Sequence, residues 1–265
     1  MTRQSTESKL GTRHRQILDL AKQQGFLSTE ALARHFDVTT QTIRRDINYL
    51  CDEGLLRRFH GGAGPASSVE NVDYSARQIL NHEAKIRIAQ AVVGEIPDNA
   101  SLFINIGTTT EEVAKALAGH RNLRIITNNL NVASLLCGNE NFEVIVAGGV
   151  VRSDRGVIGE STIDFIRQFK VDFGIIGISG IDADGTLLDF DYREVRVAQA
   201  IIENSRQIFL VTDRTKFSIT PMVKLGTLAD VDVLFTDAAP PADIQTILTE
   251  TQTRLVIAKD APLID

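Results

Sequence analysis

The chain has 265 residues, of which 43% are hydrophobic and 23% charged, with 19 Gly, 6 Pro and 2 Cys. This composition is typical of an ordinary globular protein, and it excludes a collagen, a disulfide scaffold and an intrinsically disordered chain. The formal net charge of −6 divides into 10 Lys and Arg against 7 Asp and Glu in residues 1–60, and 18 against 27 in residues 61–265, so that only the first part of the chain is expected to meet a polyanion.

The sequence predicts a cytoplasmic protein without a metal or cofactor. No apolar run approaches the roughly 18 residues of a membrane helix, and the first residues lack the apolar centre of a signal peptide. Cys51 and Cys137 lie far apart, without neighbouring Cys or His at ligand spacing. Neither a zinc site nor a disulfide framework is therefore expected.

The first 60 residues show the spacing of three short helices. Apolar residues at helical spacing predict a first helix over residues 10–24. Ser28 and Thr39 are suitable N-caps for a second helix that ends at Phe36 and a third that ends near Glu53. A short helix, a tight turn and a polar-faced helix make a helix-turn-helix, which binds DNA.

The third helix has one apolar side, which must turn inward. Ile43, Ile47 and Leu50 share this side by i, i+4, i+7 spacing. After the helix, two adjacent cations precede a Gly pair, which predicts a wing that contacts the DNA backbone or minor groove, the alternative being a solvated basic hairpin. The predicted DNA contacts lie on the polar side of the third helix and on the wing: Thr39, Thr40, Gln41, Thr42, Arg44, Arg45, Asn48, Arg57, Arg58 and His60.

The remaining sequence alternates between strand and helix signals. Residues 61–75 are rich in Gly, Ala, Ser and Asn and predict a linker between a DNA-binding domain at 1–60 and a second domain at 76–265. Ile- and Val-rich runs separated by helices favour an α/β fold with a mainly parallel sheet covered on both faces. The expected strands are 101–106, 123–127, 142–147, 171–178, 207–211, 231–236 and 254–258.

A ligand of such a sheet binds beyond the carboxyl ends of the strands, where Gly and polar residues recur. The loop Gly107–Thr110 precedes a helix, so its N–H and hydroxyl groups can bind an anion that the helix dipole favours. The alternative is that Thr110 only caps the helix, and Glu111 and Glu112 lie uncomfortably close to a dianion. Lys216 either pairs with a phosphate or is solvated. The loop is neither a Walker A motif nor a dinucleotide fingerprint.

Several motifs resemble those of DeoR-type bacterial repressors. The resemblance rests on residues 25–30, 36–47 and 60–63 in the first domain. In the second domain, residues 105–109, 127–129, 147–149 and 177–182 are similar to the effector domain of that family, so the resemblance covers nearly the whole chain. It implies a fold related to sugar-phosphate isomerases. Where the family usually has Asp before the Gly-Thr-Thr loop, this chain has Asn105, which reduces repulsion of a phosphate and also bears on the choice of effector.

The resemblance implies a repressor of carbohydrate or glycerol-phosphate metabolism genes. A small phosphorylated metabolite, first of all glycerol 3-phosphate, would release it from double-stranded operator DNA, and the second domain would sense this effector and hold a dimer or tetramer together. The expected effector contacts are Asn105, Gly107, Thr108, Thr109, Thr110, Asn128, Gly149, Asp182 and Lys216.

Two alternatives remain open. One is a sugar-phosphate isomerase-like enzyme with a DNA-binding appendix, which needs a base at the substrate carbon. Asp182, Asp213 or Glu194 can serve as that base, but no acid/base pair occurs at informative spacing, so no enzyme is expected. The other is a DNA-binding protein whose second domain only oligomerises.

Overall fold

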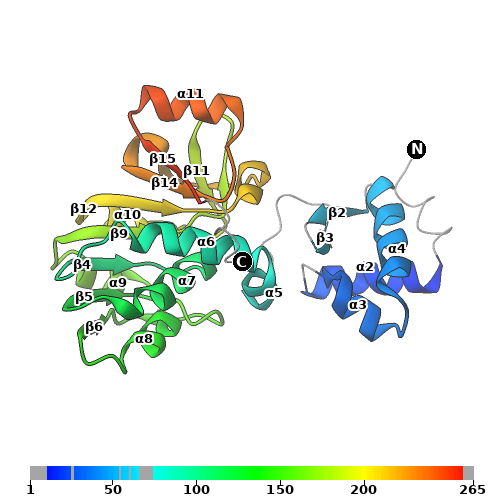
Figure 1. The fold of residues 1–265 in the computed structure, drawn as a ribbon, viewed down its shortest axis with the longest axis horizontal. Helices are drawn as coiled ribbons and strands as arrows, with labels where there is room; N and C mark the ends of the chain where they lie inside the picture. Colours follow the sequence, from blue (N-terminus) through cyan, green and yellow to red (C-terminus); the bar gives the residue numbers. More distant parts are fainter. Residues whose placement is uncertain (1–10, 25–26, 54, 60, 66–73, 259–265) are drawn as a thin grey trace, which may run out of the picture. The chain divides into compact units, whose positions relative to one another are not determined.

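The computed structural model describes residues 11–24, 27–53, 55–59, 61–65 and 74–258. The chain divides into two compact units, residues 1–81 and residues 82–265 (Figure 1). Within the described residues, no helix is long and apolar enough to cross a membrane. In the same residues, no three His, Cys, Asp or Glu side chains group as metal ligands would.

The first unit is a helix-turn-helix with a small antiparallel sheet. Its helices are α2 (Thr12–Gln24), α3 (Thr29–His35) and α4 (Thr40–Asp52), and its sheet has the order β1 (Leu27–Ser28), β3 (Gly62–Pro65), β2 (Leu56–Phe59). The two predicted N-caps are present: Ala31 N donates to Ser28 Oγ at 3.0 Å, and Thr42 N donates to Thr39 Oγ1 at 3.2 Å. The hairpin of β2 and β3 is the predicted wing.

The stretch expected to be a linker, residues 61–75, begins with a strand. β3 pairs with both β2 and β1, and Ala63 is fully buried between them. The sequence hides this strand because its Gly and Ala residues show no apolar alternation, whereas their small side chains allow close packing. The same stretch ends where α5 (Tyr74–Ile79) begins, so the first unit extends beyond residue 60.

The second unit is built on the parallel sheet that the sequence predicts. The order of its seven strands is β15-β14-β12-β9-β4-β5-β6, and every neighbouring pair is parallel. Along the chain the order runs outward in both directions from β4 and β9, so that the topological switch point lies between these two strands. The strands are β4 (Ser101–Ile104), β5 (Leu123–Thr127), β6 (Phe142–Val146), β9 (Val171–Ile176), β12 (Ser205–Val211), β14 (Val233–Thr236) and β15 (Arg254–Ile257).

Helices cover both faces of this sheet. Leu102 and Ile104 of β4 belong to a core shared with α6 (His82–Val93), α7 (Thr108–Ala116) and α8 (Leu130–Leu136). Phe103, between them, points to the opposite face and the core formed with α9 (Glu160–Ile166), α10 (Tyr192–Glu203) and α11 (Ala242–Glu250). This alternation explains why the strands have continuous apolar runs. The α/β fold class is confirmed.

Short elements at the sheet edge were not predicted. They are the hairpin of β7 (Val150–Val151) and β8 (Val157–Ile158), and a small sheet of β10 (Gly180–Ile181), β11 (Thr186–Asp189) and β13 (Val223–Thr227). The 3₁₀ helices η1 (Leu117–Gly119), η2 (Arg214–Ser218) and η3 (Leu228–Asp230) complete the unit. β7 and β8 follow β6, and β10 and β11 follow β9, so these hairpins surround the carboxyl ends of the strands.

Candidate DNA-binding surface and effector site

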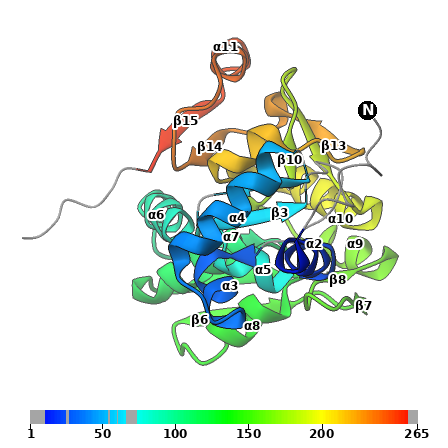
Figure 2. The same ribbon diagram turned by 90° about the vertical axis from the view of Figure 1, so that its right-hand side faces the viewer.

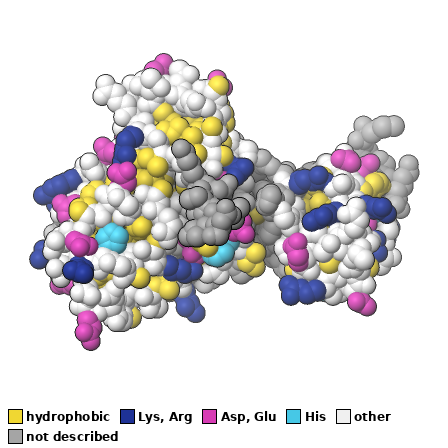
Figure 3. All heavy atoms as spheres, in the orientation of Figure 1, with side chains coloured by type: hydrophobic (Ala, Val, Ile, Leu, Met, Phe, Trp, Pro, Cys, Tyr) yellow, Lys and Arg dark blue, Asp and Glu magenta, His cyan; other side chains and the backbone are white. Residues whose placement is uncertain are grey.

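The polar side of α4 is exposed as the sequence predicts. Ile43, Ile47 and Leu50 are buried, whereas the opposite side of the helix faces solvent. Lys and Arg side chains gather on the visible face of the first unit (Figure 3). The exposed predicted contacts are Thr39, Thr40, Gln41, Arg44, Arg45, Asn48 and Arg58.

The other predicted DNA contacts differ in environment. Thr42 is half-buried, and its hydroxyl lies 2.9 Å from that of Thr39, so the pair forms part of the helix start. Arg57 lies on β2, but its side chain and the whole of His60 fall outside the described residues.

A buried carboxylate, absent from the prediction, holds α4 to α2. Asp46 Oδ2 accepts a hydrogen bond from Arg13 Nε at 2.6 Å, and Asp46 Oδ1 accepts one from Arg13 Nη2 at 3.1 Å and lies 3.0 Å from His14 Nε2. His14 also stacks on Tyr49 with ring centroids 4.9 Å apart. Asp46 falls on the inward side of α4, beside Ile47. An acid at a position where the periodicity requires an apolar residue was the available signal.

The loop after β4 is tied down by its own hydrogen bonds. Asn105 N donates to Ile175 O of β9 at 3.0 Å, so the loop leaves β4 at the switch point. Gly107 has φ +151° and is the N-cap of α7, without a side-chain cap. The Thr110 hydroxyl donates to Asn105 O at 2.7 Å and to Gly107 O at 2.8 Å. Thr110 therefore does not cap the helix, as the alternative interpretation required, but stabilises the turn.

The helix begins earlier than expected, at Thr108 instead of residue 111. Thr108, Thr109 and Thr110 therefore form its first turn, where backbone N–H groups lack intrahelical acceptors. Thr108 is half-buried, whereas Thr109 is 8% exposed and Thr110 fully buried. Thr108 and the backbone of this turn are thus the parts that a ligand can reach most directly.

The two acidic residues of α7 are both engaged elsewhere. Glu111 is 5% exposed, and its Oε1 accepts from Asn129 Nδ2 at 3.1 Å and from Asn131 Nδ2 at 3.0 Å. Glu112 Oε1 accepts from Lys115 Nζ at 2.7 Å. Amide donors and an ammonium group offset these charges, so the expected repulsion of a dianion is reduced.

Four buried side-chain oxygens without a hydrogen-bond partner lie just after strands of the sheet, in the part of the chain that the structure describes. They follow β4, β5 and β12 and end β14. Leaving a buried polar atom without a hydrogen-bond partner costs roughly 1–3 kcal/mol of folding free energy, so such an atom is a candidate to bind a ligand or a water molecule. These atoms are Asn105 Oδ1, Asn128 Oδ1, Thr212 Oγ1 and Thr236 Oγ1.

Contacts around the loop bring several of the predicted effector residues together. Asn128 Nδ2 donates to Val157 O of β8 at 3.1 Å, and Val157 N donates to Asn128 O at 2.7 Å. A Cβ on Gly156 would lie 2.5 Å from Ile106 Cδ1, so the β7–β8 hairpin also packs against the loop after β4. Asn105, the start of α7 and Asn128 therefore surround one edge of the sheet.

Gly149 and Asp182 have other surroundings than expected. A Cβ on Gly149 would lie 2.2 Å from Thr162 Oγ1 and 2.7 Å from Ile158 O, so the glycine permits close packing of the hairpin. Asp182 begins the turn between β10 and β11, in which Gly185 N donates to Asp182 O at 2.9 Å. Gly185 packs against Ile247 of α11. Asp182 therefore lies at the end of a hairpin and not directly at the end of β9.

Two lysines are candidates for neutralising an anion. Lys216 lies on η2, which contacts β10, and is partly exposed. Lys85, which the sequence analysis missed, is 3% exposed on α6. Because α6 precedes β4, it starts at the carboxyl edge of the sheet, and His82 Nδ1 lies 3.7 Å from Glu112 Oε1 at the start of α7. Lys85 shares a stripe with Ile88, which was the available sequence signal.

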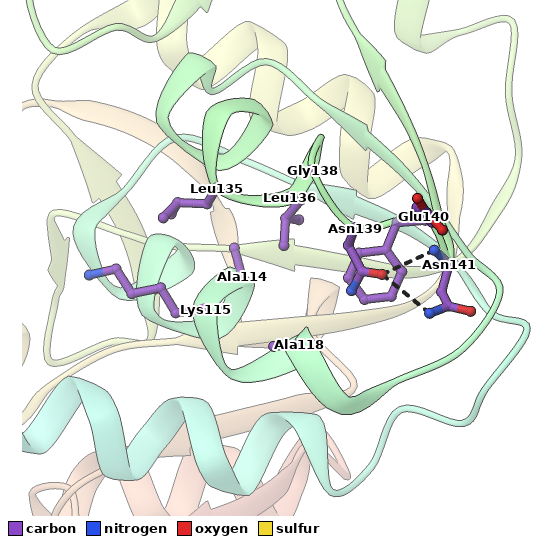
Figure 4. Close-up of a pocket in the computed structure, with 10 residues that line it drawn as sticks. Ala114, Lys115, Ala118, Leu135, Leu136, Gly138, Asn139, Glu140 and Asn141 are labelled. Atoms are coloured by element: carbon purple, nitrogen blue, oxygen red, sulfur yellow. Dashed lines mark hydrogen bonds between the residues drawn. The ribbon is translucent and has the colours of Figure 1, made fainter.

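A separate pocket of about 680 Å³ lies between α7 and α8 (Figure 4). Its residues come from the second half of each helix and from the loop before β6, at the amino edge of the sheet. This pocket therefore lies at the opposite edge of the sheet from the start of α7, and it does not coincide with the predicted effector site. It is lined by Ala114, Lys115, Ala118, Leu135, Leu136, Gly138, Asn139, Glu140, Asn141 and Phe142.

The architecture, a winged helix-turn-helix followed by an α/β unit with buried polar side chains at the carboxyl ends of its strands, defines a DNA-binding regulator with a sensor domain. Residues 13–69 match the model of the DeoR-like helix-turn-helix domain, and residues 80–238 match that of the DeoR C terminal sensor domain. The chain belongs to the DeoR family, which confirms the resemblance found in its motifs.

Within this family the chain is similar to the glycerol-3-phosphate regulon repressor. It is 53% identical to the protein of that name from Escherichia coli (strain K12) over 92% of this chain and 97% of the relative. It is 54% identical to the protein of the same name from Haemophilus influenzae, over 94% of this chain and 97% of that relative. These relatives are repressors, not enzymes, so the isomerase-like alternative is not supported. A solved ribose 5 phosphate isomerase A from Neisseria gonorrhoeae is 15% identical over 50% of this chain and 52% of that one, with a TM-score of 0.36, too low to support an argument.

Proposed function

We propose that the protein represses genes of glycerol-phosphate or carbohydrate metabolism and leaves its operator when a small phosphorylated metabolite binds the second unit. Glycerol 3-phosphate is the effector that we favour, because both relatives described above are named for its regulon. The observation that carries the proposal is the start of α7, where first-turn donors follow the 2% exposed Asn105, whose Oδ1 has no hydrogen-bond partner.

On the DNA side, α4 enters the major groove. Gln41 and Arg45 contact base edges and Arg44 contacts a phosphate, because all three side chains are exposed, Gln41 and Arg45 on the side opposite the buried Ile43 and Arg44 on the flank of the helix. A good base contact contributes roughly 1–3 kcal/mol of discrimination. The wing residues add contacts to the DNA backbone, which carry no sequence information, or to the minor groove, which distinguishes mainly A·T from G·C pairs.

On the effector side, the phosphate binds the backbone N–H groups of Thr108 and Thr109 and the hydroxyl of Thr108. A dianion in an acidic unit needs both close N–H donors and a cation to offset its desolvation. Lys85 and Lys216 supply the positive charge, with Lys85 the stronger candidate, because a buried ammonium group is less screened by solvent. Asn105 Oδ1 and Asn128 Oδ1, the unpartnered oxygens after the neighbouring strands β4 and β5, accept hydrogen bonds from the hydroxyl groups of the effector.

Asn105 favours phosphate binding more than the Asp that the family usually has at this position. A carboxylate there would repel the phosphate, whereas an amide adds no charge. Its side chain is almost fully buried and follows β4 directly, next to the phosphate-binding turn. The amide therefore favours a small ligand that presents a hydroxyl group close to its phosphate.

Release from DNA requires that the effector bind one arrangement of the DNA-binding units better than the other, since equal affinity would shift nothing. The protein acts as a dimer or larger, because a single helix-turn-helix makes too few contacts to compete with genomic DNA, whereas two on one scaffold gain from effective concentration. The second unit supplies the contact between copies.

Thermal unfolding with glycerol 3-phosphate, glycerol and inorganic phosphate tests the effector site. A ligand at 100 times its Kd stabilises the native state by about 2.7 kcal/mol, and we expect this shift for wild type with glycerol 3-phosphate. Thr108→Ala should lose most of the shift. Thr246→Ala, on an exposed position of α11, is the matched control and should retain it. An unchanged shift in Thr108→Ala would place the site elsewhere.

DNA selected from a random pool by the wild-type protein tests release. Glycerol 3-phosphate should dissociate the wild-type complex, whereas Thr108→Ala should bind the same DNA and remain bound. The isomerase-like alternative predicts turnover of sugar phosphates, which the same incubation followed by product analysis would detect.

A further inference from the structure

Four exposed apolar side chains lie on short segments around the carboxyl edge of the second unit. Val150 and Val151 of β7 are 65% and 55% exposed, Tyr192 at the start of α10 is 61% exposed, and Met222 before β13 is 84% exposed. We call these four residues the rim patch. Apolar side chains exposed to this extent on neighbouring segments are typical of an interaction surface.

Polar contacts connect these segments to one another. Arg152 Nη1, directly after β7, donates to Asp191 Oδ2 at 3.2 Å and to Glu194 Oε2 at 2.6 Å, which joins β7 to the start of α10. β11 pairs with β13 through Asp189 and Val223, which brings Met222 to the segment that leads into Tyr192. In Figure 2, β7, β8, α9 and α10 lie along one flank of the second unit.

β7 also presents an open strand edge. It pairs with β8, whose Val157 and Ile158 are buried, and no further strand pairs with β7 among the described residues. An exposed edge with β-branched residues invites pairing with another chain, and proteins usually cover it. The two residues of β7 therefore leave an edge to which a segment of another chain can pair.

The charges next to the rim patch balance, although the unit as a whole is acidic. Residues 82–265 carry 17 Lys and Arg against 25 Asp and Glu, so two copies repel each other over most of their surface. Beside the patch, four arginines accompany four carboxylates, several of them as ion pairs. They are Arg152, Arg155, Arg193 and Arg196 with Asp154, Asp191, Glu160 and Glu194.

We propose that the rim patch is the surface on which a second copy of this chain docks about a two-fold axis. In such an interface each patch meets the same patch of the other copy. The contact surface must therefore be apolar, or its positive and negative charges must match each other. The rim patch is apolar, and the arginines and carboxylates beside it balance in number. The inference rests on the proposed function, which requires two DNA-binding units on one scaffold, and it assigns the contact between them.

The same surface is coupled to the proposed effector site. Glu111, in the first half of α7, accepts from Asn131 Nδ2, which also donates to Asp154 O in the β7–β8 hairpin at 3.3 Å. The Asp154 carboxylate in turn accepts from Arg152 Nη2 at 3.0 Å. A ligand that shifts the start of α7 thus acts on the hairpin that carries half of the rim patch, which gives the effector a route to the relation between copies.

Sedimentation velocity of the full chain at micromolar concentration, without DNA, tests the proposal. Wild type should sediment as a dimer or larger. Val151→Ser and Tyr192→Ser should each weaken self-association about tenfold or more, because each change occurs twice across a two-fold interface. Leu135→Ser, also an exposed apolar position but at the other edge of the sheet, is the matched control and should sediment as wild type.

Three outcomes would overturn the proposal: a monomeric wild type, variants that associate as strongly as wild type while keeping its melting temperature, or a control that dissociates equally. The use of two variants on separate segments guards against misfolding of one. Glycerol 3-phosphate binding, measured on the same samples, separates this inference from the proposed function. If wild type binds no glycerol 3-phosphate but the variants still dissociate, the effector assignment fails and the interface stands.

Discussion

Replacing the buried carboxylate of α4 should destabilise the DNA-binding unit. Asp46→Ala removes two hydrogen bonds from Arg13 and a contact of 3.0 Å with His14. A hydrogen bond to a charged group contributes about 1.5–3 kcal/mol when well shielded. The Arg13 side chain is 39% exposed and that of His14 21%, so solvent screens part of this interaction. We therefore expect a loss of about 2 kcal/mol in the free energy of unfolding.

Calorimetry of the full chain measures this loss as a lower melting temperature of the first unit. A change of 1 kcal/mol shifts the melting temperature of a domain of this size by about 4–8 °C, so the expected decrease is about 8–16 °C. Asp52→Ala, at the exposed end of the same helix, is the control and should change it little. Equal effects of the two substitutions would show that Asp46 does not clamp α4 to α2. Affinity for DNA at a temperature where both variants are folded should fall only for Asp46→Ala.

Three further results are expected. Arg45→Ala should reduce the preference for selected over random DNA, whereas Arg44→Ala should weaken binding to both and lower the slope of log affinity against log salt concentration by about one. Fluorescence anisotropy at several salt concentrations measures both effects. Equal affinities of Arg45→Ala and wild type for both DNAs would contradict the assignment. Gly149→Ala should lower the melting temperature of the second unit, because its Cβ would overlap a backbone carbonyl at 2.7 Å, and an unchanged melting temperature would show that the hairpin relaxes freely. Hydrogen bonds from the Ser101 hydroxyl and N–H lower the pKa of Asp172. The contribution of Asp172 to the free energy of unfolding is therefore present at neutral pH and is lost as the pH falls through the lowered pKa. Asp172→Asn should show a weaker acid dependence of unfolding than wild type, and an unchanged dependence would contradict this role.

The features that the sequence predicts well are those with local causes. The inward side of α4 follows from the spacing of Ile43, Ile47 and Leu50, and all three are buried. The N-caps at Ser28 and Thr39 follow from residue type and position. Each depends on neighbours within one or two helical turns, so the periodicity and the capping residues suffice to predict them.

The features that it misses depend on contacts between distant segments. β3 forms a strand because β1 and β2 supply its hydrogen bonds, and nothing in its Gly and Ala residues indicates this pairing. Asp46 and Lys85 are charged residues on helical stripes that otherwise are apolar, and their burial depends on the partner helices. Residue type alone favours an exposed position for both, since isolated charges are rarely buried.

The sequence by itself determined the two kinds of domain, the parallel sheet, the polar side of α4 and the position of the Gly107 loop, because these follow from periodicity, capping and alternation along the chain. Only the tertiary structure decided how the loop is used. It turns Glu111 toward Asn129 and Asn131, ties the Thr110 hydroxyl to the loop backbone, and leaves Asn105 Oδ1 buried without a partner in the loop that leads into α7. The physical reason is that the hydrogen-bond partner of a buried polar group is chosen among segments that meet in space, and their meeting is set by strand order and helix packing across the whole unit.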